Sequence, residues 1–152
     1  MNAAASASPR QRWMAVLARA SSGDILALLA GCDALPEATV LRGPEPGLVM
    51  LRGRAGGGGL AFNMGEASVT RCTVRDASGQ VGHAYRLGRD ADAALLSARL
   101  DAALQDPARA DALLDHVIAP LTAAQQDARD AGASRAAATR VQFFTMSTMR
   151  SS

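Results

Sequence analysis

The chain has 152 residues, of which 49% are hydrophobic and 3% aromatic, and its formal net charge is +2. This length supports one ordinary hydrophobic core and is too short for two full domains. The net charge is too small to indicate a nucleic-acid-binding protein. All sixteen basic residues are arginine, which excludes a Walker A lysine, a lysine Schiff base and a lysine general base.

The two cysteines and the N-terminus indicate the compartment. Cys32 and Cys72 form neither a CxxC pair nor a disulfide framework, and no signal sequence is recognisable, which favours a reducing cytoplasm. Residues 1–9 are predicted to be a disordered or tag-like lead, followed by a single domain over residues 10–150. No stretch approaches the roughly 20 apolar residues of a membrane span.

Arginine is concentrated in the centre of the chain. Between Arg42 and Arg89 there are seven arginines against three acidic residues, a local balance of +4. The remainder holds nine arginines and eleven acidic residues, a balance of −2. The centre is therefore where we expect an anion or an acidic partner surface to bind.

Two short helices are predicted near the N-terminus. Apolar residues recur at helical spacing over residues 13–20, and after the break "SSGD" a second apolar face covers residues 25–29. A DNA-binding helix-turn-helix would share this arrangement, but the second segment has no basic or amide side chain to contact base edges. A DNA-binding regulator therefore ranks last among the possible functions.

Strands are predicted over residues 39–43 and 47–54. Between them, "PEPG" at residues 44–47 is predicted to be a rigid turn, because helices and central strands do not accommodate its prolines. The run "LVML" at residues 48–51 is apolar at every position. It therefore predicts a strand that is covered on both faces.

A β-hairpin is predicted over residues 66–87. The first strand alternates, and Asp76–Gly79 supplies a tight turn with glycine in its last position. In the returning strand, Val81, His83, Tyr85 and Leu87 share one face, opposite Gln80, Gly82, Ala84 and Arg86. Because His83 falls on the apolar face, we expect it to be packed or half-buried rather than a catalytic base.

The C-terminal part predicts helices. Residues 88–105 place Leu96, Leu100 and Leu104 on one stripe, and Asp106-Pro107 begins a further helix that Pro120 should kink or end. An alanine-rich polar stretch leads to "RVQFFTM", residues 140–146, predicted to be a last strand or a docking segment. The fold class is therefore α+β: a small antiparallel, meander-like sheet with an N-terminal helix pair and C-terminal helices.

The glycine run "RAGGGG" is the main candidate site. Four consecutive glycines expose backbone N–H groups that can bind an anion, and nearby arginines on strands could contact a polyanion. The candidate anion- or partner-binding residues are Arg52, Arg54, Gly56, Gly57, Gly58, Gly59, Glu66 and Arg71. Neither Walker A nor the Rossmann fingerprint is satisfied, because lysine is absent and a strand follows the glycines. A flexible loop, and a solvated strand face or protein interface, rank ahead of phosphate binding.

No catalytic or metal site is predicted. Glu66 could act as a base or hold an arginine, but no second carboxylate or nucleophile accompanies it in the sequence. His116, beside Asp115, is predicted to be exposed. Two cysteines and two histidines are suitable zinc ligands by type, but none of them is paired at ligand spacing.

Five segments carry a resemblance: "RQRWMAVLARA", "LRGPEPGLVMLRGRAGGGGLAFNMGEASVTRCTV", "GHAYRLGRD", "DAALQ" and "TRVQFFTM". In this order they closely resemble the PhnG subunit family of the bacterial carbon-phosphorus lyase system, over residues 10–146. The central "PEPGLVMLRGR...FNMGEASVTRC" is the most specific part. The chain departs from the family at its end, where "STMRSS" stands in place of a V-R-G-E type segment.

The resemblance implies an accessory or scaffolding subunit that works in phosphonate breakdown. Its partners would be the H, I and J subunits of a core complex, with possible self-association, and the ATPase-like L subunit. The complex would replace the adenine of ATP by a phosphonate such as methylphosphonate. The resemblance assigns this base displacement to the I subunit, and an iron-sulfur cluster with S-adenosylmethionine to the J subunit. It implies no cofactor and no established catalytic residue for this chain.

A second hypothesis follows from the residues alone. The Gly56–Gly59 loop with Arg52, Arg54 and Arg71 could form a stand-alone anion- or nucleotide-binding module. Binding of ATP by the isolated chain would distinguish this module from a scaffolding subunit.

Overall fold

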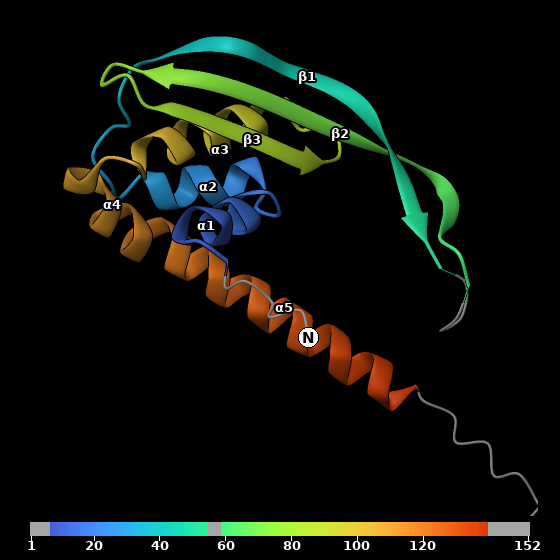
Figure 1. Cartoon of the computed structure of the whole chain (residues 1–152). Helices are drawn as coiled ribbons and strands as arrows, with labels where there is room; N and C mark the ends of the chain where they lie inside the picture. Colours follow the sequence, from blue (N-terminus) through green and yellow to red (C-terminus); the bar gives the residue numbers. More distant parts are fainter. Residues whose placement is uncertain (1–6, 55–58, 140–152) are drawn as a thin grey trace, which may run out of the picture.

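The computed structural model describes residues 7–54 and 59–139. Two helices come first, a three-stranded antiparallel sheet follows, and further helices come after it. The helices gather on one face of the sheet (Figure 1). The elements are α1 (Pro9–Leu17), α2 (Ser22–Leu29), β1 (Ala38–Gly53), β2 (Phe62–Asp76), β3 (Val81–Leu87), α3 (Ala91–Ala103), α4 (Pro107–Leu113), η1 (Leu114–Ile118) and α5 (Ala119–Ala138). The predicted α+β class is confirmed. The predicted segment 140–146 lies outside the described residues.

Serine or aspartate side chains cap four of the helices, and the starts predicted at "SSGD" and Asp106-Pro107 are confirmed. α1 begins at Pro9, which falls within the residues predicted to be a disordered lead. Ser8 caps α1 through a reciprocal capping box with Gln11, and Ser21 accepts a hydrogen bond from the backbone of Asp24 at the start of α2. Asp90 and Asp106 cap α3 and α4 in the same way. Each cap satisfies a backbone N–H group that the first helical turn leaves without a partner. For α2 and α4, local sequence was therefore sufficient to indicate where the helix begins.

The predicted turn at "PEPG" is wrong, because residues 38–53 form one continuous strand. β1 lies at the edge of the sheet, and its pairing with β2 is irregular between Val40 and Glu45. An edge strand tolerates proline because its outer N–H groups need no partner within the sheet. Gly43, with φ of 74°, is required here, since a side chain at this position would overlap the carbonyl oxygen of Arg71.

The expectation that "LVML" is covered on both faces is also wrong. Leu48, Met50 and Leu51 are 62%, 51% and 45% exposed. The reason is that β3 pairs with β2 from Val69 to Arg75, so among the described residues the parts of β1 and β2 beyond that point pair only with each other. We call this two-stranded ribbon, residues 48–53 with 62–68, the arm; it extends past the helices (Figure 1).

The predicted hairpin of β2 and β3 is confirmed, but the inner face of β3 is the opposite of the predicted one. Gly82, Ala84 and Arg86 are buried, whereas His83 and Tyr85 are exposed. The prediction of a packed His83 is therefore wrong. The physical reason is the close approach of α3, since a side chain at residue 82 would overlap its backbone.

α3 contributes to two cores. One side of it places Leu100 and Leu104 among the helices, as the predicted stripe requires, with Leu96 partly buried against the same cluster. Its other side presents a row of alanines to the sheet. This second core consists of Cys72, Val74, Ala84, Ala94, Ala98 and Ala102. Small side chains allow helix and sheet to approach closely, which accounts for the low aromatic content of the chain.

Pro120 does not end the helical run, which continues from Pro107 to Ala138. A wider turn, η1, lies just before it, where Ala119 donates to the carbonyl of Leu114 five residues back. Proline has no N–H group, and its ring crowds the carbonyl four residues earlier in a regular α-helix. The wider turn makes room for the ring, so the helix continues past Pro120. Among the helices of the described ranges, none has both the length and the apolar character needed to cross a membrane.

Candidate functional site

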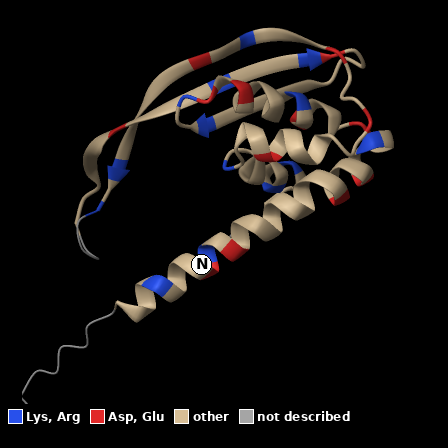
Figure 2. Cartoon of the chain, turned by 180° about the vertical axis from the view of Figure 1, so that it is seen from behind, with Lys and Arg blue, Asp and Glu red and all other residues tan. Residues whose placement is uncertain are grey.

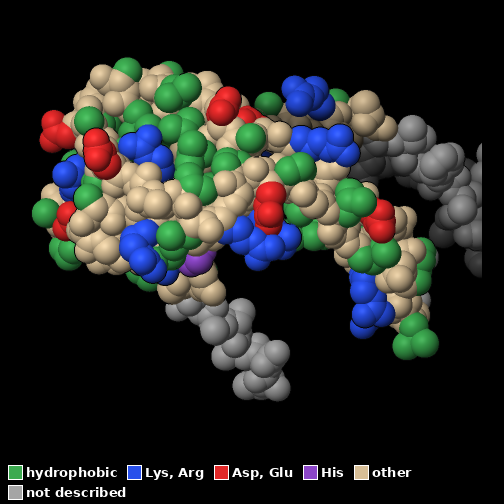
Figure 3. Space-filling view, turned by 90° about the horizontal axis from the view of Figure 1, so that it is seen from above, with side chains coloured by type: hydrophobic (Ala, Val, Ile, Leu, Met, Phe, Trp, Pro, Cys, Tyr) green, Lys and Arg blue, Asp and Glu red, His purple; other side chains and the backbone are tan. Residues whose placement is uncertain are grey.

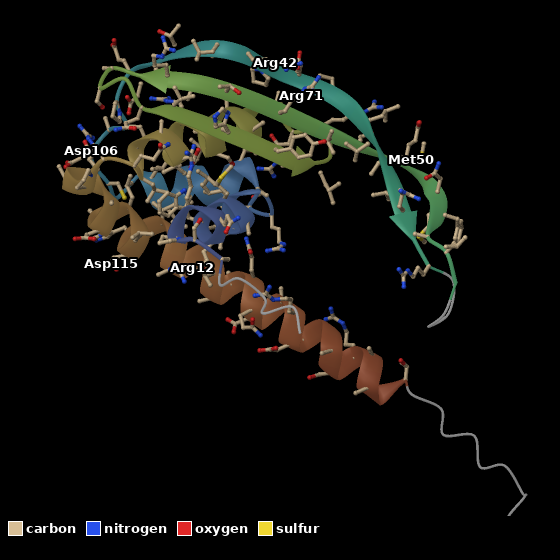
Figure 4. The ribbon with its side chains drawn as sticks, viewed as in Figure 1. Arg12, Arg42, Met50, Arg71, Asp106 and Asp115 are labelled. Atoms are coloured by element: carbon tan, nitrogen blue, oxygen red, sulfur yellow. The ribbon has the colours of Figure 1, made fainter. Side chains whose placement is uncertain are left out.

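Arg71, one of the predicted anion-binding residues, contacts a carboxylate of its own chain. Its Nε donates to Oε1 of Glu45 at 2.7 Å, and Nε of Arg42 donates to the same oxygen at 2.7 Å. Arg42 and Arg71 lie on adjacent strands, β1 and β2 (Figure 4). The hydrogen bonds from Arg42 and then Arg71 lower the pKa of Glu45 below its ordinary value. The three side chains form an exposed cross-strand ion cluster with one surplus positive charge.

Of the other predicted residues, Arg52 and Glu66 lie in the arm. Arg52 is exposed, and its Nη2 donates to the carbonyl of Ala61 at 3.4 Å. Arg54 and Gly59 are also exposed, and Glu66 lies opposite Met50 in the ladder. Gly56, Gly57 and Gly58 lie outside the described residues. Arg52 and Glu66 therefore belong to the arm, Arg54 and Gly59 lie just beyond its strands, and Arg71 belongs to the three-stranded part.

The sheet register separates the arginines into two groups. Arg52 pairs with Asn63 of β2, and Arg71 follows eight residues further along the same strand. At about 3.4 Å per residue this separation is roughly 27 Å. Arg71 and Arg52 therefore do not converge on one small anion. Figure 2 shows that the positions of the basic residues are spread along the strands rather than gathered at one point.

The arm also carries an apolar surface that the sequence patterns did not reveal. Apolar side chains are exposed along both strands of the arm (Figure 3). Leu60, just before β2 begins, is exposed as well. These residues are Leu48 (62%), Met50 (51%), Leu51 (45%), Leu60 (95%), Phe62 (49%) and Met64 (64%). The available signal was a difference in length, since the seven residues of β3 cannot cover the sixteen of β1.

A buried carboxylate lies between the sheet and the helices. Asp101 is fully buried and accepts hydrogen bonds from Arg10, from the indole of Trp13 and from the backbone N–H of His83. The distances from donor to carboxylate oxygen are 3.1 and 2.7 Å for Arg10, 2.9 Å for Trp13 and 2.8 Å for His83. These four hydrogen bonds occupy both oxygens. Asp101 therefore joins α1, α3 and β3 and is not placed to act as a general base.

Arg86 has a comparable structural position. It is 7% exposed and donates to the carbonyls of Leu17 at 3.4 Å and Ala20 at 2.5 Å, at the C-terminal end of α1. Burial lowers the pKa of Arg86, and the nearby carboxylate of Asp90 partly offsets this effect. The guanidinium satisfies carbonyls that the helix end leaves without partners.

A hollow of about 240 Å³ lies between the loop after α2 and the run of α4 and η1. Cys32, Arg109 and His116 line it. The predicted exposure of His116 is confirmed, and its Nδ1 lies 2.8 Å from the carbonyl of Ala112. Arg109 donates to the carbonyl of Ala34 at 3.3 Å. Within the described ranges, no three histidine, cysteine or acidic side chains are grouped so that they could hold a metal ion.

Comparison with known proteins gives two consistent findings. The family model described as "Phosphonate metabolism protein PhnG" matches residues 8–150. The chain is also 47% identical over 140 residues to a protein of Rhizobium meliloti (strain 1021), alpha-D-ribose 1-methylphosphonate 5-triphosphate synthase subunit PhnG. The match covers 90% of this chain and 87% of that relative.

Proposed function

Because the chain belongs to the PhnG family of phosphonate metabolism proteins, we propose that it is an accessory subunit of an alpha-D-ribose 1-methylphosphonate 5-triphosphate synthase. The observation that carries the proposal is the 47% identity to a subunit of that name over 90% of the chain. The match includes both the helical body and the arm, so the relation extends over the whole architecture and not over one motif.

The chemistry of the described residues supports an accessory role. Asp101 is buried with its oxygens occupied, and Glu45 is held by two arginines. His83 is exposed, and its Nδ1 lies 3.2 Å from the hydroxyl oxygen of Thr73. These side chains contact other parts of the same chain. The contact between the hydroxyl of Thr73 and the imidazole of His83 is exposed on the sheet, and within the described residues no third side chain orients that imidazole as a catalytic base would require. The role of this subunit is therefore to bind and position partners.

The partners in this proposal are the H, I and J subunits, with the ATPase-like L subunit required for activity. ATP and a phosphonate are the substrates of the assembly, and adenine leaves as the phosphonate takes its place on the ribose. The iron-sulfur cluster and S-adenosylmethionine belong to a partner. Both cysteines of this chain are unpaired, which agrees with a reducing cytoplasm as the compartment.

Co-expression tests this proposal directly. The tagged chain should co-purify with the H, I and J subunits from the same source, and with the L subunit the mixture should release adenine from ATP and methylphosphonate. Omission of this chain should remove both the intact particle and adenine release. Assembly and full activity of the other subunits without this chain would contradict an accessory role.

A further inference from the structure

We infer that the arm is the surface by which this chain docks on another subunit, and that the partner presents an apolar groove with acidic side chains at its rim. The inference rests on the proposed function, because it names the contact surface for the assembly proposed there. It concerns residues 48–53 and 62–68, together with Leu60 and the exposed residues at the base of the arm.

The backbone of the arm is open on both sides. β1 is an edge strand throughout, and β3 ends at the pair Val69 and Leu87, so β2 has no second neighbour along the arm within the described residues. A two-stranded ribbon is only marginally stable in water by itself. Its free N–H and C=O groups can pair with a strand of another chain. This geometry favours an arm that is covered in the working assembly.

Exposed apolar side chains also lie at the base of the arm. Leu87, 67% exposed, lies opposite Val69 where the arm begins, and Tyr85, 53% exposed, follows on the same strand. Exposed apolar patches larger than a few hundred Å² typically mark interaction sites. A standard interface uses roughly 20–30 residues on each side, so the arm needs these neighbours to complete one. The arm and its base together supply such a surface.

Charge identifies the kind of partner. Arg52 and Arg54 are exposed near the end of β1, and within the described ranges neither forms an ion pair. Within residues 48–54 and 59–68 the charged residues are Arg52, Arg54 and Glu66, so the arm together with Arg54 has a net charge of +1. Acidic side chains at the rim of the partner groove would complement it and would set the orientation of docking.

The same charges disfavour two other occupants. A second copy of the arm with Arg54 would bring a second net charge of +1 to the interface. The C-terminal segment, residues 140–152, contains Arg140 and Arg150 and no acidic residue. Both would place like charges together, which reduces affinity. The occupant with matching chemistry is therefore a different chain.

The test uses a double variant of exposed arm residues, Leu48→Ser with Met50→Ser, and a matched control, Leu26→Ser. Leu26 is 54% exposed on α2, comparable to the arm residues but on another surface. Each tagged protein is co-expressed with the partner subunits of the proposed assembly. We expect the wild type and the control to co-purify with the same amount of partner subunits. The arm variant should co-purify with at least tenfold less of them than the wild type. The three isolated proteins should have the same circular dichroism spectrum.

The charge component is tested by Arg52→Glu with Arg54→Glu, which should weaken co-purification at least tenfold. The matched control is Arg129→Glu with Arg135→Glu on α5, which should leave it unchanged. An arm whose serine and glutamate variants assemble like the wild type overturns the inference and leaves the proposed function standing. Failure of the wild type to assemble overturns both.

Two results on the isolated chain would also overturn the inference. A dimer by light scattering that the arm variant converts to a monomer would identify a second copy as the occupant. Amide exchange on the arm that becomes faster when residues 140–152 are removed would identify the chain's own C-terminal segment. A monomer with unchanged, fast exchange on the arm supports docking on a different subunit.

Discussion

The indole N–H of Trp13 donates to Oδ1 of Asp101 at 2.9 Å, across 88 residues of sequence. Arg10 and the backbone N–H of His83 donate to the same carboxylate. Asp101 is therefore the point at which α1, α3 and β3 meet. The arrangement holds the helical layer against the strand that ends at the base of the arm, so it fixes the support from which the arm extends.

Replacement of Asp101 by asparagine should reduce the free energy of unfolding by about 3 kcal/mol. The amide keeps the shape of the carboxylate, but it removes the charge and turns an N–H group toward donors that need an acceptor. Urea denaturation measures the change. The control Asp115→Asn lies on an exposed site and should shift stability by less than about 0.5 kcal/mol. A loss below 1 kcal/mol for Asp101→Asn would mean that the buried contacts contribute little.

Two glycine substitutions should change the stability of the fold in opposite directions. Alanine at position 82 would overlap the carbonyl of Ala98 and lie 2.9 Å from the Cβ of Ala102, so Gly82→Ala should destabilise by about 3 kcal/mol or more. Gly132 is within α5 with no atom near an added Cβ, so Gly132→Ala should stabilise by about 0.5–1 kcal/mol. Thermal unfolding followed by circular dichroism distinguishes them. Equal effects of the two changes would contradict the close packing of α3 on β3.

Local patterns were sufficient for the elements that local interactions determine. The break "SSGD" and Asp106-Pro107 identified the starts of α2 and α4. Asp76–Gly79 identified the turn of the hairpin, where the N–H of Gly79 donates to the carbonyl of Asp76 at 3.0 Å. The stripe of Leu100 and Leu104 also packs as its spacing predicts. In each case the residues that decide the structure are within a few positions of one another.

Features that depend on distant segments were missed. The inner face of β3 is decided by the alanine row of α3, since only Gly82 and Ala84 leave room for it, and residue hydrophobicity alone suggested the other face. The exposure of the arm depends on where β3 stops pairing with β2. Asp101 gains its partners from residues 88 and 91 positions away. Arg71 was grouped with Arg52 by composition, although the register separates them.

The carboxyl group of Glu45 should titrate below its ordinary value of 4.5. Arg42 and Arg71 stabilise the charged form in the folded state, so the contribution of this cluster to stability is complete above about pH 4.5. It is lost as the pH falls through the lower folded-state pKa. NMR titration of the side-chain carboxyl measures this value, and Arg71→Gln should move it back toward 4.5. Arg75→Gln, on the same strand, should leave it unchanged, and equal shifts in both variants would contradict the direct contact.

The two thiols should react at very different rates. Cys72 is 1% exposed, and burial raises its pKa, whereas Cys32 lines a hollow that is open to solvent. A disulfide reagent at pH 8 should therefore label Cys32 in the native protein and Cys72 only on unfolding, because the thiolate is the reactive form. Mass spectrometry of timed samples identifies the labelled residue. In Cys32→Ser, rapid labelling without urea would show that Cys72 is accessible.

ATP should not bind the isolated chain with a dissociation constant below about 100 μM, which corresponds to roughly −5.5 kcal/mol. Arg71 is held by Glu45 and lies on a different part of the sheet from Arg52, so the described arginines do not form one phosphate site. Calorimetric titration at low salt provides the measurement, with Arg129→Ala on α5 as the control for nonspecific charge effects. Tighter binding that disappears in Arg54→Ala but persists in Arg129→Ala would instead establish the nucleotide-binding module, centred on the glycine run that follows Arg54.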